Sequence, residues 1–211
     1  MHAVVSRCGS AAARIAALTI LLLPACSAAP LKQPVWSAPT DPMALAAKAG
    51  FVPTDREFLV THTHVHLDVY VDGTEVPIPA GIGIDTTSKG VTESPTPDGT
   101  GKDYQVQVCD KPCLSELHTH DPDGILHSES KVPDNKPAKL GQFFTEWGVR
   151  LDGSCVGEFC SSNTSIAVYV DGKQVNGNPA DIELKPHLEI AIIIGKAPVL
   201  IPDHWDFLPG T

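Results

Sequence analysis

The chain has 211 residues, with 15 basic and 25 acidic side chains, and its formal net charge is −10 at pH 7. This acidity argues against nucleic acid or an anionic membrane surface as a partner, because both carry dense negative charge. The length suffices for one domain with its own hydrophobic core, preceded by a leader.

The first 25 residues have the layout of a secretory signal peptide. Arg7 and Arg14 precede an apolar segment, residues 15–23, that is too short to span a bilayer permanently. The sequence then reads Leu-Pro-Ala-Cys, which resembles the box at which bacterial lipoproteins are cleaved and lipid-modified on the cysteine, here Cys26. We therefore expect an extracytoplasmic protein that is lipid-anchored in the cell membrane. The alternative is cleavage near residues 27–29, which would give a secreted soluble protein. Loss of the two arginines leaves 13 basic and 25 acidic residues, a net charge of −12.

Residues 26–50 are predicted to link this anchor to the domain. The part before residue 41 is rich in proline, alanine and serine, a composition typical of an extended tether. An Asp-Pro pair and a later glycine then frame a short helix from Met43 to Ala49. A single β-rich domain is expected to cover residues 51–211.

Four cysteines lie in this domain, and an oxidising compartment favours two disulfides between them. We prefer the local pairs Cys109–Cys113 and Cys155–Cys160. The two cross-linked connectivities are alternatives, as is a zinc half-site at the Cys-x-x-x-Cys motif.

Two segments of the domain resemble each other, residues 67–76 and residues 166–175. Each is a β-rich run followed by Asp-Gly, a strong signal for a tight β-hairpin turn. Each continues through a proline-containing loop into a short apolar segment that is predicted to be a strand, Gly83-Ile84 in the first case and residues 182–184 in the second. The repeat predicts two β-hairpin units of similar design.

The region between these units contains a polar segment and a third hairpin. Residues 85–103 are rich in Gly, Pro, Thr and Ser and are predicted to form a long loop. Strands are predicted over residues 104–108 and 114–120. The turn signal Asp-Pro-Asp-Gly then predicts a hairpin between residues 117–120 and 125–130.

Two further elements complete the expected fold. Leu140, Phe143, Phe144 and Trp147 recur at helical spacing before a glycine, which predicts an amphipathic helix with its aromatic side chains in the core. The β-branched run at residues 190–194 predicts a buried strand. We therefore expect a mainly β fold, a β-rich α+β domain with one or two short helices and a sandwich-like or grasp-like sheet.

Six of the nine histidines lie on the first predicted strand and on the hairpin described above. Alternate side chains of a strand share one face, so the imidazoles of the first run lie on one side and aliphatic residues on the other. The four-residue turn sets His118 opposite His127, with His120 on the same face. If the two stretches are neighbours in one sheet, five or six imidazoles converge. The predicted metal ligands are His62, His64, His118, His120 and His127. Among these, His62 is expected to be an alternative ligand to the other four. His66 and Asp121 are possible further ligands.

Neutral imidazoles are the commonest protein ligands of late transition metals, so this clustering favours a metal site over a solvated polar face. The donor set suits Cu(II) or Zn(II), and the sequence does not choose between them. Asp121 is expected mainly to cap its turn. Glu116 and Glu129 would be the general bases of a catalytic site, although a carboxylate on a strand is usually solvated. His187 and His204 lie outside the cluster and are expected to be structural.

The segment Leu117-His-Thr-His-Asp-Pro-Asp-Gly-Ile-Leu-His-Ser-Glu-Ser130, followed by Leu-Gly-Gln-Phe-Phe-Thr-Glu-Trp-Gly, resembles a family of secreted or membrane-anchored prokaryotic proteins. The family pattern is His-Thr-His-Asp, a turn, Gly-Ile-x-His-x-Glu-Ser, then Leu-Gly-x-Phe-Phe-x-x-Trp-Gly. The likeness covers most of residues 61–196. The third histidine of the first run and Cys109 depart from the pattern. The resemblance implies where the site lies and implies no particular reaction.

Three functions fit these observations. The first is an envelope lipoprotein that captures, buffers or delivers a divalent transition metal, copper or zinc. The second is a metal-dependent extracytoplasmic enzyme, a hydrolase or an oxidase, in which the ion activates water or oxygen. The third is a structural or interaction lipoprotein with no metal. The expected partners are the metal ion and the lipid anchor in the membrane.

Overall fold

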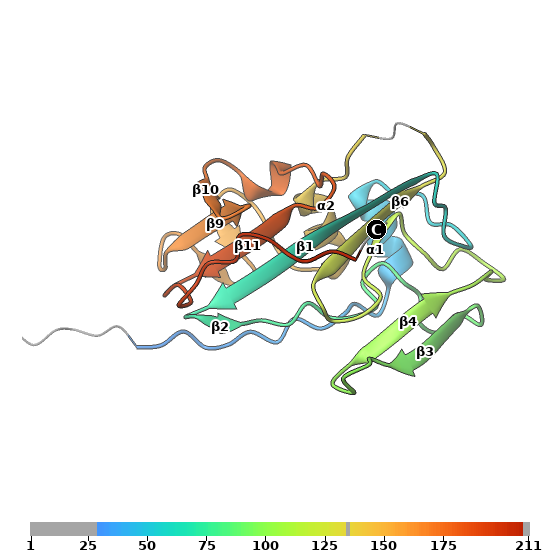
Figure 1. Cartoon of the computed structure of the whole chain (residues 1–211), viewed down its shortest axis with the longest axis horizontal. Helices are drawn as coiled ribbons and strands as arrows, with labels where there is room; N and C mark the ends of the chain where they lie inside the picture. Colours follow the sequence, from blue (N-terminus) through green and yellow to red (C-terminus); the bar gives the residue numbers. More distant parts are fainter. Residues whose placement is uncertain (1–28, 134–135, 209–211) are drawn as a thin grey trace, which may run out of the picture.

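The computed structural model describes residues 29–133 and 136–208. The predicted signal peptide and the predicted lipidation site at Cys26 lie outside these residues. Within them, a seven-stranded mixed sheet forms the body of the molecule; helix α2 packs on it, and helix α1 packs against α2 (Figure 1). The predicted fold class, a mainly β, α+β domain, is confirmed.

Both predicted helices form where their stop signals place them. Helix α1 covers Pro42–Ala49 and helix α2 covers Leu140–Trp147. Each is followed by a glycine in the left-handed region, Gly50 at φ 93° and Gly148 at φ 76°, whose N–H bonds to the last helical turn. Glycine adopts this backbone conformation without strain, so the sequence itself specifies where each helix ends.

The main sheet has the strand order β10-β9-β11-β1-β6-β5, and β2 pairs with β1 outside this path. Its strands are β1 (Thr61–Val71), β2 (Thr74–Glu75), β5 (Leu117–His118), β6 (Ile125–Ser130), β9 (Ile166–Val170), β10 (Lys173–Val175) and β11 (Glu189–Ile194). Strand β1 pairs parallel with β11 and antiparallel with β6, so it joins the two halves of the sheet. Strand β11 is buried along its whole length, as its β-branched run predicts.

The two similar units fold into hairpins, as predicted. Asp72 and Asp171 both adopt φ 49°, and the glycines that follow them have φ 77° and 69°. Positive φ at both central positions gives a turn whose twist matches that of the strands. The strands predicted at Gly83-Ile84 and at residues 182–184 are wrong, because each segment makes only a single bridge. A left-handed glycine turn and the 3-10 helix η1 (Pro179–Asp181) interrupt the extended backbone there.

Part of the predicted polar loop is a strand. Strand β3 (Val91–Pro95) lies within residues 85–103 and pairs with β4 (Lys102–Val106) in a small separate sheet. Because β3 is largely exposed, it lacks the alternating buried apolar side chains by which a strand is recognised in a sequence. The strand predicted over residues 114–120 is also too long, since β5 covers only Leu117–His118.

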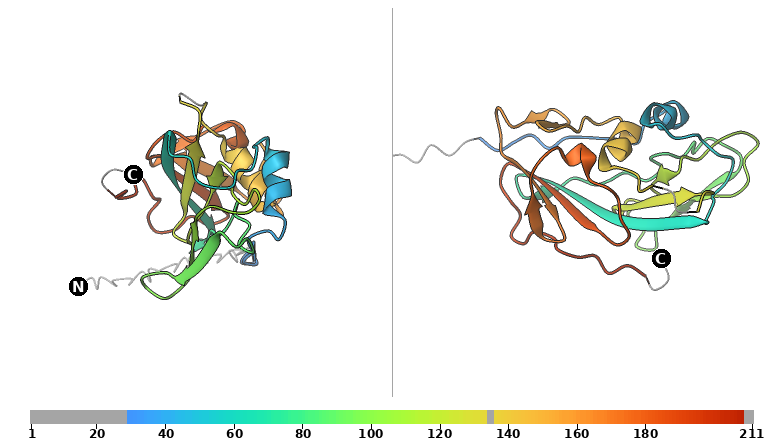
Figure 2. Two further views of the ribbon diagram at one scale, coloured as in Figure 1. Left: turned by 90° about the vertical axis from the view of Figure 1, so that its right-hand side faces the viewer. Right: turned by 90° about the horizontal axis from the view of Figure 1, so that it is seen from above.

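The two helices cover one face of the main sheet (Figure 2). Val65, Leu67 and Val69 of β1 belong to the large core between the sheet and α2. The aromatic side chains of α2 fill this core, as their spacing predicts: Phe143, Phe144 and Trp147. This layering of helices on a single main sheet matches the grasp-like alternative better than the sandwich-like one.

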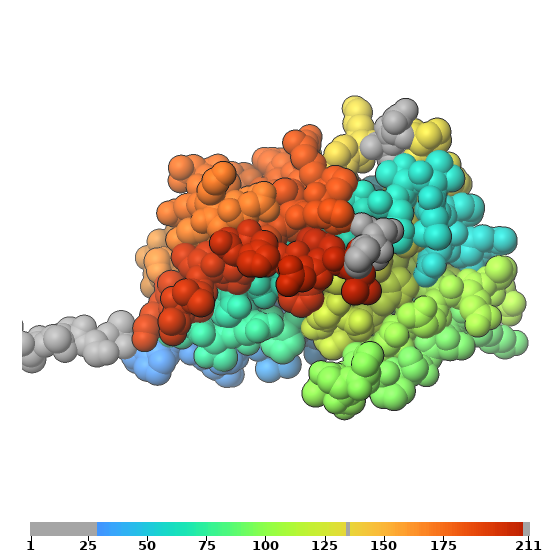
Figure 3. All heavy atoms as spheres, viewed as in Figure 1, coloured from blue at the N-terminus to red at the C-terminus, as the bar shows by residue number. Residues whose placement is uncertain are grey.

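The opposite face of the sheet carries polar side chains and the C-terminal segment. Residues 196–208, red in Figure 1 and Figure 3, run from the end of β11 back across β1 toward β6. The segment therefore lies on the side of the sheet that the helices leave open.

The N-terminal residues of the described chain are extended, as expected of a tether, but they lie against the domain. Trp36 packs edge-on against Trp147 and Phe159, with ring centroids 5.6 and 6.3 Å apart. The backbone N–H of Leu31 donates to the carboxylate of Asp72. Residues 29–40 therefore belong to the folded unit.

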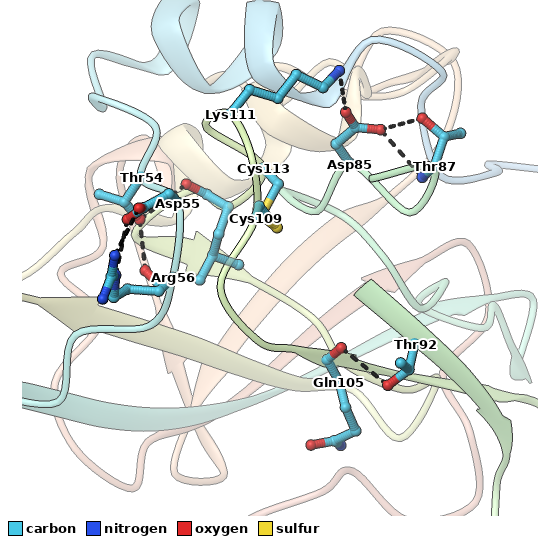
Figure 4. The surroundings of a disulfide bond; sticks show 11 residues. Thr54, Asp55, Arg56, Asp85, Thr87, Thr92, Gln105, Cys109, Lys111 and Cys113 are labelled. Carbon is cyan, nitrogen blue, oxygen red and sulfur yellow. Dashed lines mark hydrogen bonds and ion pairs between the residues drawn. A yellow bond between two sulfur atoms is a disulfide. The ribbon is translucent and has the colours of Figure 1, made fainter. Parts of the chain in front are cut away.

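Two disulfides join the four cysteines of the domain, and both are the preferred local pairs. Cys109–Cys113 packs with Ile84 and Leu114 in a second small core, and the loop between the cysteines carries Lys111, which pairs with Asp85 (Figure 4). The second disulfide, Cys155–Cys160, links β7 (Cys155–Val156) to β8 (Phe159–Cys160). Two disulfides in one small domain are typical of extracytoplasmic proteins.

Glu146 of α2 is a buried acid that should make stability depend on pH. The hydroxyl of Ser115 donates to its Oε1 at 2.8 Å, whereas its Oε2 has no hydrogen-bond partner. Burial raises the pKa of Glu146 to about 9. The folded state therefore keeps a proton that the unfolded chain releases above pH 4.5, the ordinary pKa of this group. This contribution to stability is complete at lower pH and is lost as the pH rises toward 9.

Glu146→Gln keeps the shape of the side chain and removes its titration. The stability of the variant relative to the wild type should rise by about 2–4 kcal/mol between pH 4 and pH 8. Urea denaturation at the two pH values measures this change. A stability difference that is the same at both pH values would contradict the buried-acid assignment.

Candidate metal centre

The pairing of β1, β6 and β5 brings the two histidine runs together. His64 of β1 lies directly opposite His127 of β6, and His118 of β5 lies opposite the same residue on its other side. The predicted hairpin register is therefore confirmed, and the condition for convergence, that the two stretches are neighbours in one sheet, is met. His120 follows β5 and stays beside His118, with ring centroids 4.8 Å apart.

Two groups of side chains at this place could hold a metal ion. In each group, every residue offers one ligand atom and these atoms all lie within 4.8 Å of one another. The first group consists of His118, His120, His127 and Glu129, and the second of His62, His64 and His127. All five histidines predicted as ligands thus lie in one patch, and His127 belongs to both groups.

His118 and His120 have the most informative geometry. The Nδ1 atom of His118 lies 3.0 Å from the carbonyl oxygen of Ser115, and Nδ1 of His120 bonds the carbonyl oxygen of Tyr104. A carbonyl only accepts hydrogen bonds, so both Nδ1 atoms carry the proton. In the neutral rings, both Nε2 atoms then present lone pairs, and they lie 3.1 Å apart. Two acceptors at this distance repel each other unless a proton or a metal ion lies between them.

The second group has a different arrangement. Nε2 of His64 lies 3.0 Å from Nδ1 of His127, so one proton on either ring makes a hydrogen bond between them. Nε2 of His62 lies 3.3 Å from Oε1 of Glu129. His62 is the more exposed of these rings.

Burial keeps the central imidazoles uncharged. It lowers the pKa of His64 to about 4, and it also lowers the pKa values of His118 and His127. Neighbouring histidines add to the effect, because each charged ring would repel the next. These rings are therefore neutral at pH 7, and their lone pairs are available to a metal ion.

Glu129 is part of the centre, which corrects the expectation of a solvated carboxylate. It is only 4 % exposed, and its Oε2 has no hydrogen-bond partner. Burial, followed by repulsion from Glu57, raises the pKa of Glu129 to about 8. Its Oε1 lies 3.9 Å from Nε2 of His118. Glu116, the other predicted base, belongs to neither metal-binding group.

Glu57 is a further acid at the site that the sequence did not indicate. Its Oε1 lies 3.6 Å from Nε2 of His120. Glu57 lies in a loop before β1, where no periodic pattern marks it. It lines an open cleft of about 360 Å³ together with four of the histidines, Glu129 and Leu208 of the C-terminal segment.

Two residues proposed as possible further ligands have other contacts. Asp121 accepts a hydrogen bond from the backbone N–H of Asp123 at 2.9 Å, so it caps the turn. His66 lies on the same face as His64 but bonds Oε2 of Glu189 at 2.8 Å through its Nδ1. His66 therefore belongs to a different group, which contains no other histidine.

The two histidines expected to be structural lie outside both groups. The backbone N–H of His187 donates to the carbonyl of His64 at 2.8 Å, and its ring stacks on Phe207. His204 is exposed and pairs with Asp203 at 2.7 Å. His204 thus offers a matched control for substitutions in the centre.

Comparison with protein-family models, curated proteins and solved structures gave no match. The resemblance of the His-Thr-His-Asp segment to a prokaryotic family therefore stays a prediction. In residues 29–133 and 136–208, no helix is both long and apolar enough to cross a membrane.

Proposed function

We propose that this protein binds a divalent transition metal, copper or zinc, outside the cytoplasm and captures, buffers or delivers it. His118, His120 and His127 would hold the ion, with Glu129 as the fourth ligand. His62 and His64 would provide additional donors beside them. Four donors within reach of one ion match the coordination number that zinc takes in proteins.

The opposed Nε2 atoms of His118 and His120 are the observation that carries this proposal. Hydrogen bonds from Nδ1 to a backbone carbonyl are the usual way in which proteins orient histidine ligands toward a metal. Two such neutral rings that face each other at 3.1 Å repel each other, and a metal ion between them makes the arrangement favourable. Core packing alone gives no reason to keep this arrangement.

The available donors support Cu(II) or Zn(II) as the ion. Apart from Met1, the chain has a single methionine, Met43, and the cysteines of the domain are in disulfides, so the soft sulfur ligands that favour Cu(I) are lacking near the site. Imidazole and carboxylate suit both divalent ions, and Cu(II) binds such ligands more tightly along the divalent series. Copper is therefore expected to displace zinc when both are present.

The leader sequence and the disulfides support an envelope location. Lipidation at Cys26 would hold the domain at the membrane by a short segment, with the metal centre facing the extracytoplasmic space. A metal-dependent enzyme would use the same donors with Glu129 as its base, and this alternative stays a prediction from the sequence.

Elemental analysis of the protein purified from its native envelope tests the proposal. The wild type should contain copper or zinc, and His118→Ala and His120→Ala should each lower the metal content at least tenfold. The loss follows because each substitution removes a ligand and leaves the remaining donors with an incomplete coordination shell.

His204→Ala is the matched control, since it also removes a histidine from the same side of the domain and leaves both metal-binding groups intact. It should retain the wild-type metal content. Equal metal content in the wild type and in both centre variants would rule out the proposed ligands. A wild type that holds no metal, even after incubation with Cu(II) or Zn(II), would rule out the proposed function.

A further inference from the structure

A second group of ionisable side chains lies on the same sheet face as the histidine centre but is separate from it. His66 and Asp68 are on β1, and Glu189 is the direct neighbour of His66 on β11. The three residues are only 3 %, 9 % and 1 % exposed. Their ligand atoms also lie within 4.8 Å of one another. Charged groups are rarely this buried without a compensating partner.

The imidazole of His66 is oriented as a metal ligand would be. Its Nε2 donates to the carbonyl oxygen of Asp123 at 2.9 Å, so Nε2 carries a proton. Its Nδ1 then points at the two carboxylates, 2.8 Å from Glu189 and 3.8 Å from Asp68. A metal-binding histidine likewise donates its other ring N–H to a carbonyl or carboxylate oxygen, which fixes the orientation of the ring.

Within the described residues, only protons can balance the negative charge of this group. Oε1 of Glu189 is buried and has no hydrogen-bond partner. In the described part of the chain, the ion pairs of Asp68 and Glu189 are both with His66, and neither involves a lysine or arginine. A proton on Nδ1 of His66 would neutralise only one of the two carboxylates. A divalent cation would balance both and would give Oε1 of Glu189 a partner.

We propose that His66, Asp68 and Glu189 form a second cation site, which binds a divalent ion such as Mn²⁺, Fe²⁺ or Zn²⁺. One imidazole and two carboxylates make a harder donor set than the histidine centre, and such a set suits these ions. His64 and His66 are two residues apart on one strand, so their Cα atoms lie about 7 Å from each other. Two ions that share ligands lie about 4 Å apart, so the two sites are independent.

The C-terminal segment covers this second site. The ring of Trp205 stacks on the imidazole of His66, with centroids 3.8 Å apart and planes inclined by 12°. Figure 1 and Figure 3 show the segment crossing β1 at the exposed face of the sheet. Trp205 therefore shields the group from water and can report on it, since an ion at Nδ1 of His66 would lie beside the indole.

Titration of the full chain with Mn²⁺ tests the site, in a His120→Ala/His127→Ala background that removes a ligand from both histidine groups, because His127 belongs to both. Bound Mn²⁺ is counted by electron paramagnetic resonance, and tryptophan fluorescence is recorded in parallel. We expect one Mn²⁺ per chain and quenching of the fluorescence. Adding Glu189→Gln or Asp68→Asn should weaken binding on the order of 100-fold and abolish the quenching. Trp205→Phe should remove the quenching and keep the bound ion.

Glu93→Gln is the matched control, because it removes an exposed acid from β3, which lies in the separate small sheet. It should leave Mn²⁺ binding unchanged. Circular dichroism identifies a variant that fails to fold. If either Glu189→Gln or Asp68→Asn fails to fold, the other substitution tests the site. Absence of both Mn²⁺ and Zn²⁺ binding in the double-histidine background would overturn the proposal, as would undiminished binding in folded Glu189→Gln. Because the histidine centre is disabled in this background, the result is independent of the proposed function.

Discussion

At a free zinc concentration 100 times its dissociation constant, the wild-type protein should be about 2.7 kcal/mol more stable than the metal-free protein. The ion binds the folded state, in which the ligands are assembled, far more tightly than the unfolded chain. Of the two backbone-oriented imidazoles, His120 is the more exposed, so it is the better target for removing the effect. In His120→Ala, the same zinc concentration should raise stability by less than about 1 kcal/mol, because one ligand is gone.

In the metal-free state, His120→Ala should lose little stability relative to the wild type. Without an ion, the Nε2 atoms of His118 and His120 oppose each other at 3.1 Å, and removal of one ring relieves this repulsion. His120→Ala should therefore cost about 1 kcal/mol or less in the presence of a chelator, although the side chain is largely buried. Urea denaturation with and without zinc measures both differences. An equal zinc effect in the wild type and in His120→Ala would show that the rings do not ligate the ion, and His204→Ala should match the wild type throughout.

Gly83→Ala should destabilise the protein by about 3 kcal/mol or more, and it should also weaken metal binding. Gly83 has φ +73°, and a Cβ there would meet the carbonyl of Leu117, Oε2 of Glu146 at 2.9 Å and Cβ of His118 at 3.0 Å. The carbonyl of Gly83 also accepts the N–H of Ser115 at 2.8 Å. Because the carbonyl of Ser115 orients His118, any shift of this backbone displaces a ligand.

Gly99→Ala separates this steric effect from backbone strain. Gly99 has a nearly identical φ of +71° in the β3–β4 turn, but a Cβ there would have no atom within 4 Å. It should cost about 1 kcal/mol, the price of the left-handed conformation alone, and leave metal binding unchanged. Thermal or urea denaturation gives the two stabilities, and a zinc titration gives the affinities. If the two variants are equally stable, the close approach at Gly83 is not what constrains this part of the chain.

Local patterns made much of the fold predictable. The Asp-Gly turns fix two hairpins, and glycines after α1 and α2 fix the ends of both helices, because the required backbone conformations are specific to a few residue types. The register of the histidine hairpin was predictable for the same reason, since its turn length sets His118 opposite His127. Strand β3 was missed because it is exposed and has no apolar face.

Long-range pairing could not be predicted in this way. Nothing local indicates that Glu189 lies beside His66, because 123 residues separate them and only the parallel pairing of β1 with β11 brings them together. Glu57 approaches His120 from a loop, and Trp205 reaches His66 from the C-terminal segment. Each of these contacts depends on how distant parts of the chain pack.

The sequence by itself determined the alternation that puts imidazoles on one face of β1 and aliphatic side chains on the other, since a strand has a period of two. It also determined which cysteines are close enough to pair locally. The tertiary structure decided how the histidines are divided between the metal centre and the separate group that contains His66. It joined His118, His120 and His127 to Glu129, and it assigned His66 to two buried carboxylates. Strand order sets that division, because a strand's side-chain pattern fixes its faces but leaves its neighbours undetermined.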